Sequence, residues 1–436
     1  MAAARAAGGG APLADYGTAG KEEDADATSH SSWDWSWSRW VVFGPGLLVC
    51  LADTDAGCLI VAAQSGARWG YSLLLLQVLL IPVLFLAQEL TIRLGVHTGQ
   101  GHTACIKEHF GAFWAWFACS FLVLECVGAM VSEMSGIAAV AELWGFGRVF
   151  ATAMSAAVIV STVVFGSYRQ IESIGVALGL FELVFVVTML YCHPPISEVL
   201  KESFSIPSDS EYFSLVAANI GAVIMPWMIY FQQSAVVARR LRVEDLQLER
   251  KQTMLGSVLT QLIMIGMLVT LAYTHKQDTD IHTVTDIVNA ISPLLGATCA
   301  KVFVTLGFTG GSLCAAFVVS LAASWAVCEA LGMDDHFSLD RPPAKAPAFY
   351  TCFLAVVLTG AAVLLAGVNI VKLNIFVELM DGLLMPMAVG FLLLLAQSDA
   401  LPEHVRVRGY HKWLLWVLFG SCSLVAVGSA LYSVIH

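Results

Sequence analysis

The sequence predicts an all-α, polytopic membrane protein of eleven spans, two of which are broken near their middles. Of its 436 residues, 58% are hydrophobic and 13% are charged, a composition too apolar for the surface of a soluble protein. Apolar runs of spanning length, about 20 residues for a helix, recur along the whole chain. The expected spans are 41–66, 71–92, 112–141, 147–168, 173–193, 212–235, 253–274, 296–330, 347–367, 371–397 and 412–435.

The N-terminal segment differs in composition from the rest of the chain. Residues 1–38 are small, polar and acidic, and such a segment buries too little apolar surface to order itself. We interpret 1–38 as a disordered cytoplasmic tail and 39–436 as the transmembrane domain. With the tail inside, most of the 22 Lys and Arg lie in cytoplasmic segments, which predicts a C-terminus on the opposite side. The identity of the membrane stays open.

Charge and cysteine usage exclude several function classes. The net charge of −11 and the lack of a basic face argue against a nucleic-acid partner. The 11 cysteines lie mostly inside spans and form no CxxC pair, so we expect packing residues rather than disulfides, with Cys58 as the exception. We expect no cofactor, a lipid bilayer as surroundings, and a chain that functions as a monomer.

Two spans carry breaks at corresponding places. Span 1 contains Leu51–Cys58, in which two carboxylates and Gly57 interrupt apolar sequence, and span 6 contains Ala222–Trp227, in which Pro226 removes a backbone donor. A single kink signifies bending alone, whereas a matched pair is what a five-plus-five inverted repeat predicts. Unwound backbone at membrane depth lines cavities, and in transporters it faces the substrate. The expected repeats are 41–193 and 212–397, followed by an extra helix at 412–435.

Carboxylates are frequent within these spans, and basic partners are scarce. A buried charge must be neutralised, hydrated or paired, and no Lys or Arg lies near the middle of a span. Glu89 and Arg93 have the spacing of an intrahelical pair, which we interpret as structural. The other carboxylates must be compensated by protonation or by a bound cation. A transported divalent metal ion fits this excess of negative charge. The carboxylates are Asp53, Asp55, Glu89, Glu125, Glu133, Glu182, Glu329, Glu378 and Asp381.

The donors near the breaks combine hard and soft atoms. Asp55 lies inside the first break, Cys58 follows it by three residues, and Met225 directly precedes the breaking proline. Oxygen ligands suit Mg²⁺ and Ca²⁺, whereas sulfur favours transition metals. A membrane methionine is usually a gap filler, but its position at the break makes Met225 a candidate ligand.

Three stretches of the sequence resemble the natural-resistance-associated macrophage protein (Nramp) family of divalent metal transporters. They are Gly44-Pro-Gly46 leading to Asp55-Ala-Gly57, then Leu94-Gly-Val-His-Thr-Gly-Gln-Gly-His-Thr103, and Ala222-Val-Ile-Met-Pro226. The resemblance covers nearly all of the chain after the tail. It implies the leucine-transporter type of fold, with spans 1–5 and 6–10 inverted and an eleventh helix added.

The resemblance also implies a ligand set, with two exchanges. The family's Asp-Pro-Gly-Asn break reads Asp55-Ala-Gly-Cys58 here, so the aspartate is kept and the asparagine is a cysteine. Ala222, through its carbonyl, and Met225 match the span 6 ligands. The family's amide position in span 10 falls on Glu378, eight residues before Pro386.

Departures continue along the family's proton route. Trp227 replaces its histidine, Met130 replaces an acidic residue while Glu133 is kept, and the arginine pair expected in span 9 finds no match. A proton pathway needs groups that exchange protons near working pH. We therefore predict weakly coupled or uncoupled transport, as in the Nramp-related magnesium transporters. The candidates for pathway or coupling roles are Asp53, Gln88, Glu133, Trp227 and Asp381.

The cues for metal identity conflict, and other functions remain open. The extra carboxylate favours Mg²⁺ and the methionine favours Mn²⁺ or Fe²⁺; we favour Mn²⁺. The alternatives are a proton-coupled metal symporter, an amino-acid/sodium symporter of the same fold, a metal-sensing receptor, and an intramembrane aspartyl enzyme using Asp53 and Asp381. His97 and His102 are expected to be solvated rather than ligating. The Gly307–Ser312 run is expected to allow close helix packing.

Overall fold

The computed structural model describes residues 44–274, 281–333, 339, 341–367 and 369–435. The predicted tail, 1–38, lies outside these residues. Every regular element in the described ranges is helical, which confirms the all-α fold class. The longer helices are α1 (Pro45–Ala52), α2 (Ala56–Trp69), α3 (Leu74–Thr98), α4 (His102–Phe110), α5 (Ala112–Leu143), α6 (Arg148–Phe165), α7 (Tyr168–Gly179), α8 (Leu183–Leu190), α9 (Ile196–Ser203), α10 (Ser210–Gly221), α11 (Pro226–Ala238), α12 (Leu246–Thr274), α13 (Val284–Leu295), α14 (Ala297–Leu331), α15 (Pro347–Leu365), α16 (Ile370–Gln397) and α17 (Gly409–Ile435).

Both predicted breaks are present. Within the described residues ten helices are long and apolar enough to span a membrane, and eleven when α1 and α2, bent by 50°, count as one span. Helix α10 ends at Gly221 and α11 begins at Pro226, as the proline predicts. A third interruption was not predicted: a 3-10 turn, η2 (Leu180–Glu182), separates α7 from α8. The short helices α4, α9 and α13 were also missed.

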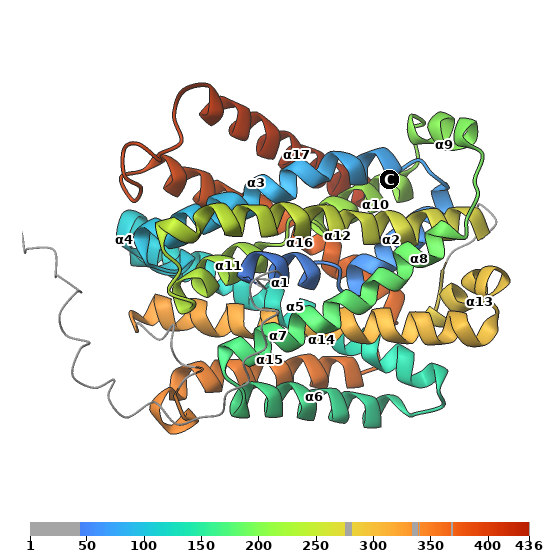
Figure 1. Ribbon diagram of the computed structural model, residues 1–436, viewed down its shortest axis with the longest axis horizontal. Helices are drawn as coiled ribbons and strands as arrows, with labels where there is room; N and C mark the ends of the chain where they lie inside the picture. The colour runs from blue at the N-terminus through green and yellow to red at the C-terminus, as the bar shows by residue number, and fades with distance from the viewer. Residues whose placement is uncertain (1–43, 275–280, 334–338, 340, 368, 436) are drawn as a thin grey trace, which may run out of the picture. The chain divides into compact units, whose positions relative to one another are not determined.

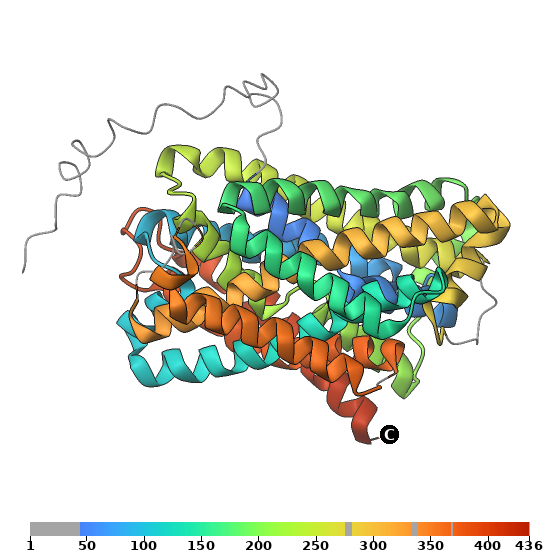
Figure 2. The same cartoon turned by 90° about the horizontal axis from the view of Figure 1, so that it is seen from below.

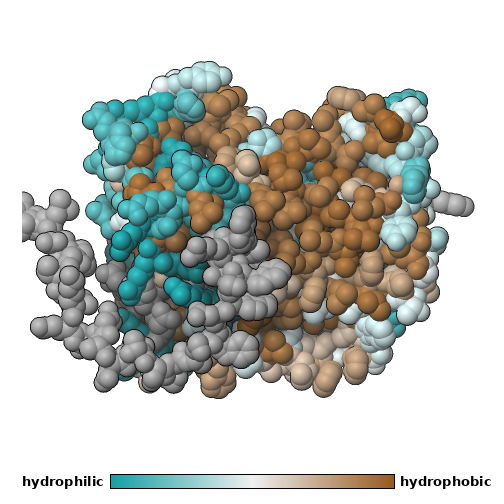
Figure 3. Space-filling model, in the orientation of Figure 1, coloured by the Kyte–Doolittle hydropathy of each residue, from teal (hydrophilic) through white to brown (hydrophobic). Residues whose placement is uncertain are grey.

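The broken helices occupy the centre of the bundle. Every residue of α1 is buried, and α2 packs against α12, α16 and α5 (Figures 1 and 2). Helices α6 and α17 lie at the periphery and expose large apolar side chains. Figure 3 shows hydrophobic surface across the middle of the molecule between two more hydrophilic ends, as expected of a chain that crosses a bilayer. The remaining short 3-10 segments are η3 (Val243–Asp245) and η5 (Pro343–Lys345).

Glycine allows α10 to approach the backbone of α16 at one functional position. A Cβ on Gly221 would overlap the carbonyl oxygen of Glu378 and would lie 2.6 Å from the amide nitrogen of Gly382. Neither atom belongs to a flexible side chain, so a larger residue must displace the helix itself. Gly221 therefore fixes the place of Glu378 relative to the break of span 6.

We predict that Gly221→Ala destabilises the protein, because overpacking costs about 1–3 kcal/mol and exceeds the gain in helix propensity. The thermal midpoint of the detergent-purified protein should fall by several degrees. Gly390→Ala is the matched control, since a Cβ on Gly390 of the same α16 meets nothing within 4 Å. An equal midpoint for the two variants would contradict this packing.

Candidate metal centre

Asp55 is held at the first break by its own helix. It is the N-cap residue of α2, and its Oδ1 accepts a hydrogen bond from the backbone amide of Cys58 at 2.8 Å. A capping carboxylate satisfies an amide that the helix leaves open at its start. The bond fixes one carboxylate oxygen, while Cys58 follows on the first turn of the same helix.

Cys58 connects the two breaks. Its Sγ lies 3.1 Å from the carbonyl oxygen of Ala222, the C-cap residue of α10, and 4.0 Å from Oε2 of Glu378 on α16. One potential ligand atom each from Asp55, Cys58 and Glu378 lies within 4.8 Å of the others. Two carboxylates, a thiol and a helix-terminal carbonyl thus converge where two half-helices meet, a donor set suited to a cation.

Gly57 makes room for the second carboxylate. A Cβ on Gly57 would overlap Oε1 of Glu378 and lie 3.0 Å from the hydroxyl oxygen of Ser132. The Glu378 side chain therefore lies directly against the first turn of α2. Only a residue without a side chain allows this approach.

The carboxylates around the breaks are buried without basic partners. Asp55 is 1% exposed and Glu378 is fully buried. Among the described residues, neither forms an ion pair with Lys or Arg, and the same holds for the neighbouring acidic groups. Such a cluster requires protons or a cation for neutrality. The neighbouring groups are Asp53, Glu125, Glu133, Glu182 and Asp381.

The other predicted site residues lie around this cluster in different roles. Met225 is buried at the start of α11, where its Sδ lies 3.1 Å from Nε1 of Trp227. Glu133 approaches the first turn of α2 and accepts from the amide of Ala56 at 3.4 Å. The amide of Trp227 donates to Oε1 of Glu125 at 3.1 Å, a contact that sequence reasoning missed.

The side chains of Asp381, Gln88 and Asp53 have no hydrogen-bond partner in the described structure. Asp381 lies on α16, one turn after Glu378, and α16 packs against α5, the helix that carries Glu125. Gln88, on α3, is fully buried, and both atoms of its amide lack partners. Asp53 ends α1. The structure thus brings Asp55, Cys58, Ala222 and Glu378 into one cluster. Asp381, Gln88 and Asp53 are not part of this cluster.

A model of the natural resistance-associated macrophage protein-like family matches residues 46–432. The chain belongs to the Nramp family. This membership confirms the resemblance inferred from the three sequence stretches, and it agrees with a transporter rather than an enzyme.

Relatives and a solved structure support the same grouping. The divalent metal cation transporter MntH 1 of Pseudomonas aeruginosa is 26% identical over 400 residues, covering 87% of this chain and 89% of that one. The MntH of Staphylococcus saprophyticus is 31% identical over 208 residues, 45% of this chain, and the match spans only 46% of that transporter. A manganese transporter from Eremococcus coleocola has a TM-score of 0.73 at 16% identity, covering 93% of this chain and 89% of that one. The leucine-transporter-type fold class is thereby confirmed.

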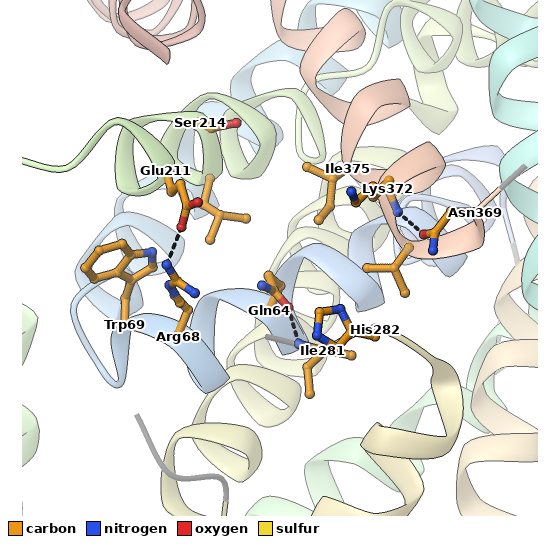
Figure 4. Close-up of a pocket in the computed structure, with 12 residues that line it drawn as sticks. Gln64, Arg68, Trp69, Glu211, Ser214, Ile281, His282, Asn369, Lys372 and Ile375 are labelled. Atoms are coloured by element: carbon orange, nitrogen blue, oxygen red, sulfur yellow. Dashed lines mark hydrogen bonds and ion pairs between the residues drawn. The ribbon is translucent and has the colours of Figure 1, made fainter. Parts of the chain in front are cut away.

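A cavity of about 290 Å³ lies at one end of the Nramp fold, beyond the cluster. It is lined from the ends of α2 and α16, the two helices that carry Cys58 and Glu378. Figure 4 shows Arg68 directed at Glu211, 2.5 Å away, and Gln64 directed at the backbone of Ile281. Gln64 lies six residues after Cys58, about 9 Å along the helix, so the cavity ends short of the cluster.

At the opposite end, α4 is held by hydrogen bonds to α14. Glu329, near the end of α14, accepts from the amides of Thr103 and Ala104 at 3.0 and 3.2 Å and from the hydroxyl of Ser234 at 2.6 Å. A carboxylate at a helix N-terminus is favourably placed, so these bonds fasten α4 to α14 and α11. The predicted Glu89–Arg93 pair is present here at 2.7 Å.

The prediction of a solvated His102 was wrong. His102 is fully buried at the start of α4, and its Nδ1 lies 2.8 Å from Oε1 of Gln233. Burial lowers the pKa of His102 to about 4, which keeps the imidazole neutral near pH 7. The error arose because the Gly-rich stretch before α4 reads as an exposed loop, whereas α4 packs back against α11. His97 is half-buried.

Proposed function

We propose that the protein transports divalent metal ions across a membrane by alternating access, with Mn²⁺ as the favoured cargo and Mg²⁺ and Fe²⁺ as competitors. The main support is the convergence of Asp55, Cys58 and Glu378 at the two helix breaks. The printed names of the relatives, divalent metal cation transporters and a manganese transporter, agree with this proposal.

The proposed ligands are Asp55, Cys58, the carbonyl of Ala222, Met225 and Glu378. Two carboxylates balance the charge of a dication, which would otherwise face a large desolvation penalty. The sulfur atoms favour Mn²⁺ and Fe²⁺, whereas the extra carboxylate keeps Mg²⁺ competitive. The sulfur of Met225 has two lone pairs, so it can bind metal through one while the other accepts the indole N–H of Trp227.

The contacts at the two ends of the bundle suggest how the site becomes accessible from each side in turn. The cavity beside Arg68 and Gln64 opens at one end and stops short of the site, while bonds between Glu329 and α4 hold helices together at the other end. Release to that end would require the Glu329 contacts to break. We propose that the α4 end is cytoplasmic, together with the N-terminus, that the C-terminus lies on the opposite side, and that one chain suffices.

We propose weak or absent proton coupling, with Asp53, Gln88, Glu133, Trp227 and Asp381 as pathway residues. Trp227 offers an indole N–H, which does not titrate in the physiological range. A proton-coupled symporter is the second candidate, and the placement of Glu133 beside Asp55 favours it. An aspartyl enzyme is disfavoured because the relatives are named as divalent metal cation transporters.

Metal uptake by proteoliposomes tests the ligand set. Asp55→Ala should lower Mn²⁺ uptake by about tenfold or more, because the dication loses half of its counter-charge. Met225→Ala should raise Mg²⁺ and Ca²⁺ uptake relative to Mn²⁺, and Glu378→Gln should impair Mg²⁺ more than Mn²⁺. Glu142→Gln, a carboxylate paired with Arg148 at the end of α5, is the control and should match the parent. Parental rates in Asp55→Ala would refute the site.

A pH-sensitive dye inside the same vesicles measures whether protons move together with Mn²⁺. We expect Mn²⁺ influx without matching acidification, because the titratable imidazole is replaced by Trp227. Acidification that rises with Mn²⁺ flux and disappears in Glu133→Gln would contradict the uncoupled mechanism and favour the symporter. Vesicles containing Asp55→Ala provide the baseline for leak.

A further inference from the structure

A second group of buried oxygen atoms lies where α1, η2 and α14 pack together. Asp53 is the C-cap residue of α1, Glu182 ends the unpredicted turn η2, and Gly311 lies on α14. The hydroxyl of Thr54 donates to Oε2 of Glu182, which ties the break of span 1 to the interruption in span 5. This group includes no thiol and none of the predicted cargo ligands.

Three carboxylate oxygens of this group lack hydrogen bonds. Asp53 and Glu182 are both fully buried. Within the described residues, Oε1 of Glu182 and both carboxylate oxygens of Asp53 have no partner. The charges that act on Glu182 are those of Asp55 and Asp53, and both are acidic. Two carboxylates thus lie together in an apolar interior with nothing basic to offset them.

A backbone oxygen adds to the group. The amide of Cys58, which would close a helical turn onto the carbonyl of Thr54, donates instead to Asp55 Oδ1 at 2.8 Å. A Cβ on Gly311 would lie 2.8 Å from this carbonyl oxygen and 2.5 Å from Oε1 of Glu182. Both oxygens therefore lie directly against Gly311, where a side chain would overlap them.

We propose that Asp53, the Thr54 carbonyl and Glu182 form a second cation site, separate from the cargo site and specific for a hard alkali or alkaline-earth ion. All of its donors are oxygen, the ligand type that such ions prefer. The open carbonyl and the unpartnered carboxylate oxygens supply ligands, and the ion supplies the missing positive charge. An ion held there joins span 1 to α14 and η2, so its occupancy sets how freely α1 moves.

The test measures ion-dependent thermal stability of the full-length purified protein in EDTA, without transport. Na⁺ and K⁺ are titrated against N-methylglucamine chloride at constant ionic strength. Mg²⁺ and Ca²⁺ are titrated without chelator in the Asp55→Ala background, where the proposed cargo site is disabled. We expect at least one of these ions to raise the midpoint saturably by about 2–6 °C, because a ligand of the native state stabilises it by mass action.

Two variants remove the proposed site by different means. Glu182→Gln removes the charge at nearly constant volume, and Gly311→Ala pushes a methyl group against the Thr54 carbonyl and Glu182 Oε1 while keeping both carboxylates. Each should abolish the ion-dependent rise, and Glu142→Gln and Gly390→Ala should keep it. A rise that survives in both site variants, or a midpoint that responds to pH but to none of the four ions, overturns the proposal. Because cargo uptake is not measured, either result leaves the function of Asp55 to be judged separately.

Discussion

The structure depends on one electrostatic constraint: carboxylates are concentrated at the helix breaks inside an apolar bundle, and the described residues provide them with no basic partners. Asp55 and Glu378 approach each other across two helix breaks instead of separating, and Asp53 and Glu182 form a second buried pair nearby. Like charges in a low-dielectric interior repel strongly, so this arrangement persists when cations or protons neutralise it. In an ion transporter, the free energy spent on burying these like charges serves a function, because the charges bind the transported ion.

Glycine and proline position these charges. Asp55 caps the start of α2, and Pro226 is the first residue of α11. The helical hydrogen bonding is interrupted before each of them, so carbonyls such as that of Ala222 can face a cation. Gly57 and Gly221 then bring α16 close enough for Glu378 to reach the break. The donors come from three helices, but small residues at the contacts fix their separation.

The fold class and the core of the candidate site were predictable from local signals. Composition and apolar runs predicted the spans, and Pro226 and the Asp53–Gly57 stretch predicted both breaks. The turn at η2 was not predicted, although Gly179 directly precedes it; Leu180–Glu182 packs on the glycines of α14. The burial of His102 likewise depends on contacts distant in sequence. Pairings such as Glu125 with Trp227 require the tertiary structure.

The central claim is that the acidic cluster at the breaks binds a dication, and equilibrium binding tests it without any assumption about transport. Electron paramagnetic resonance of free Mn²⁺, titrated with the purified full-length protein, measures this binding directly. The account predicts one tight Mn²⁺ site per chain that is lost when Asp55→Ala and Glu378→Gln are combined. Unchanged binding in the doubly substituted protein, or no binding by the parent, would contradict it.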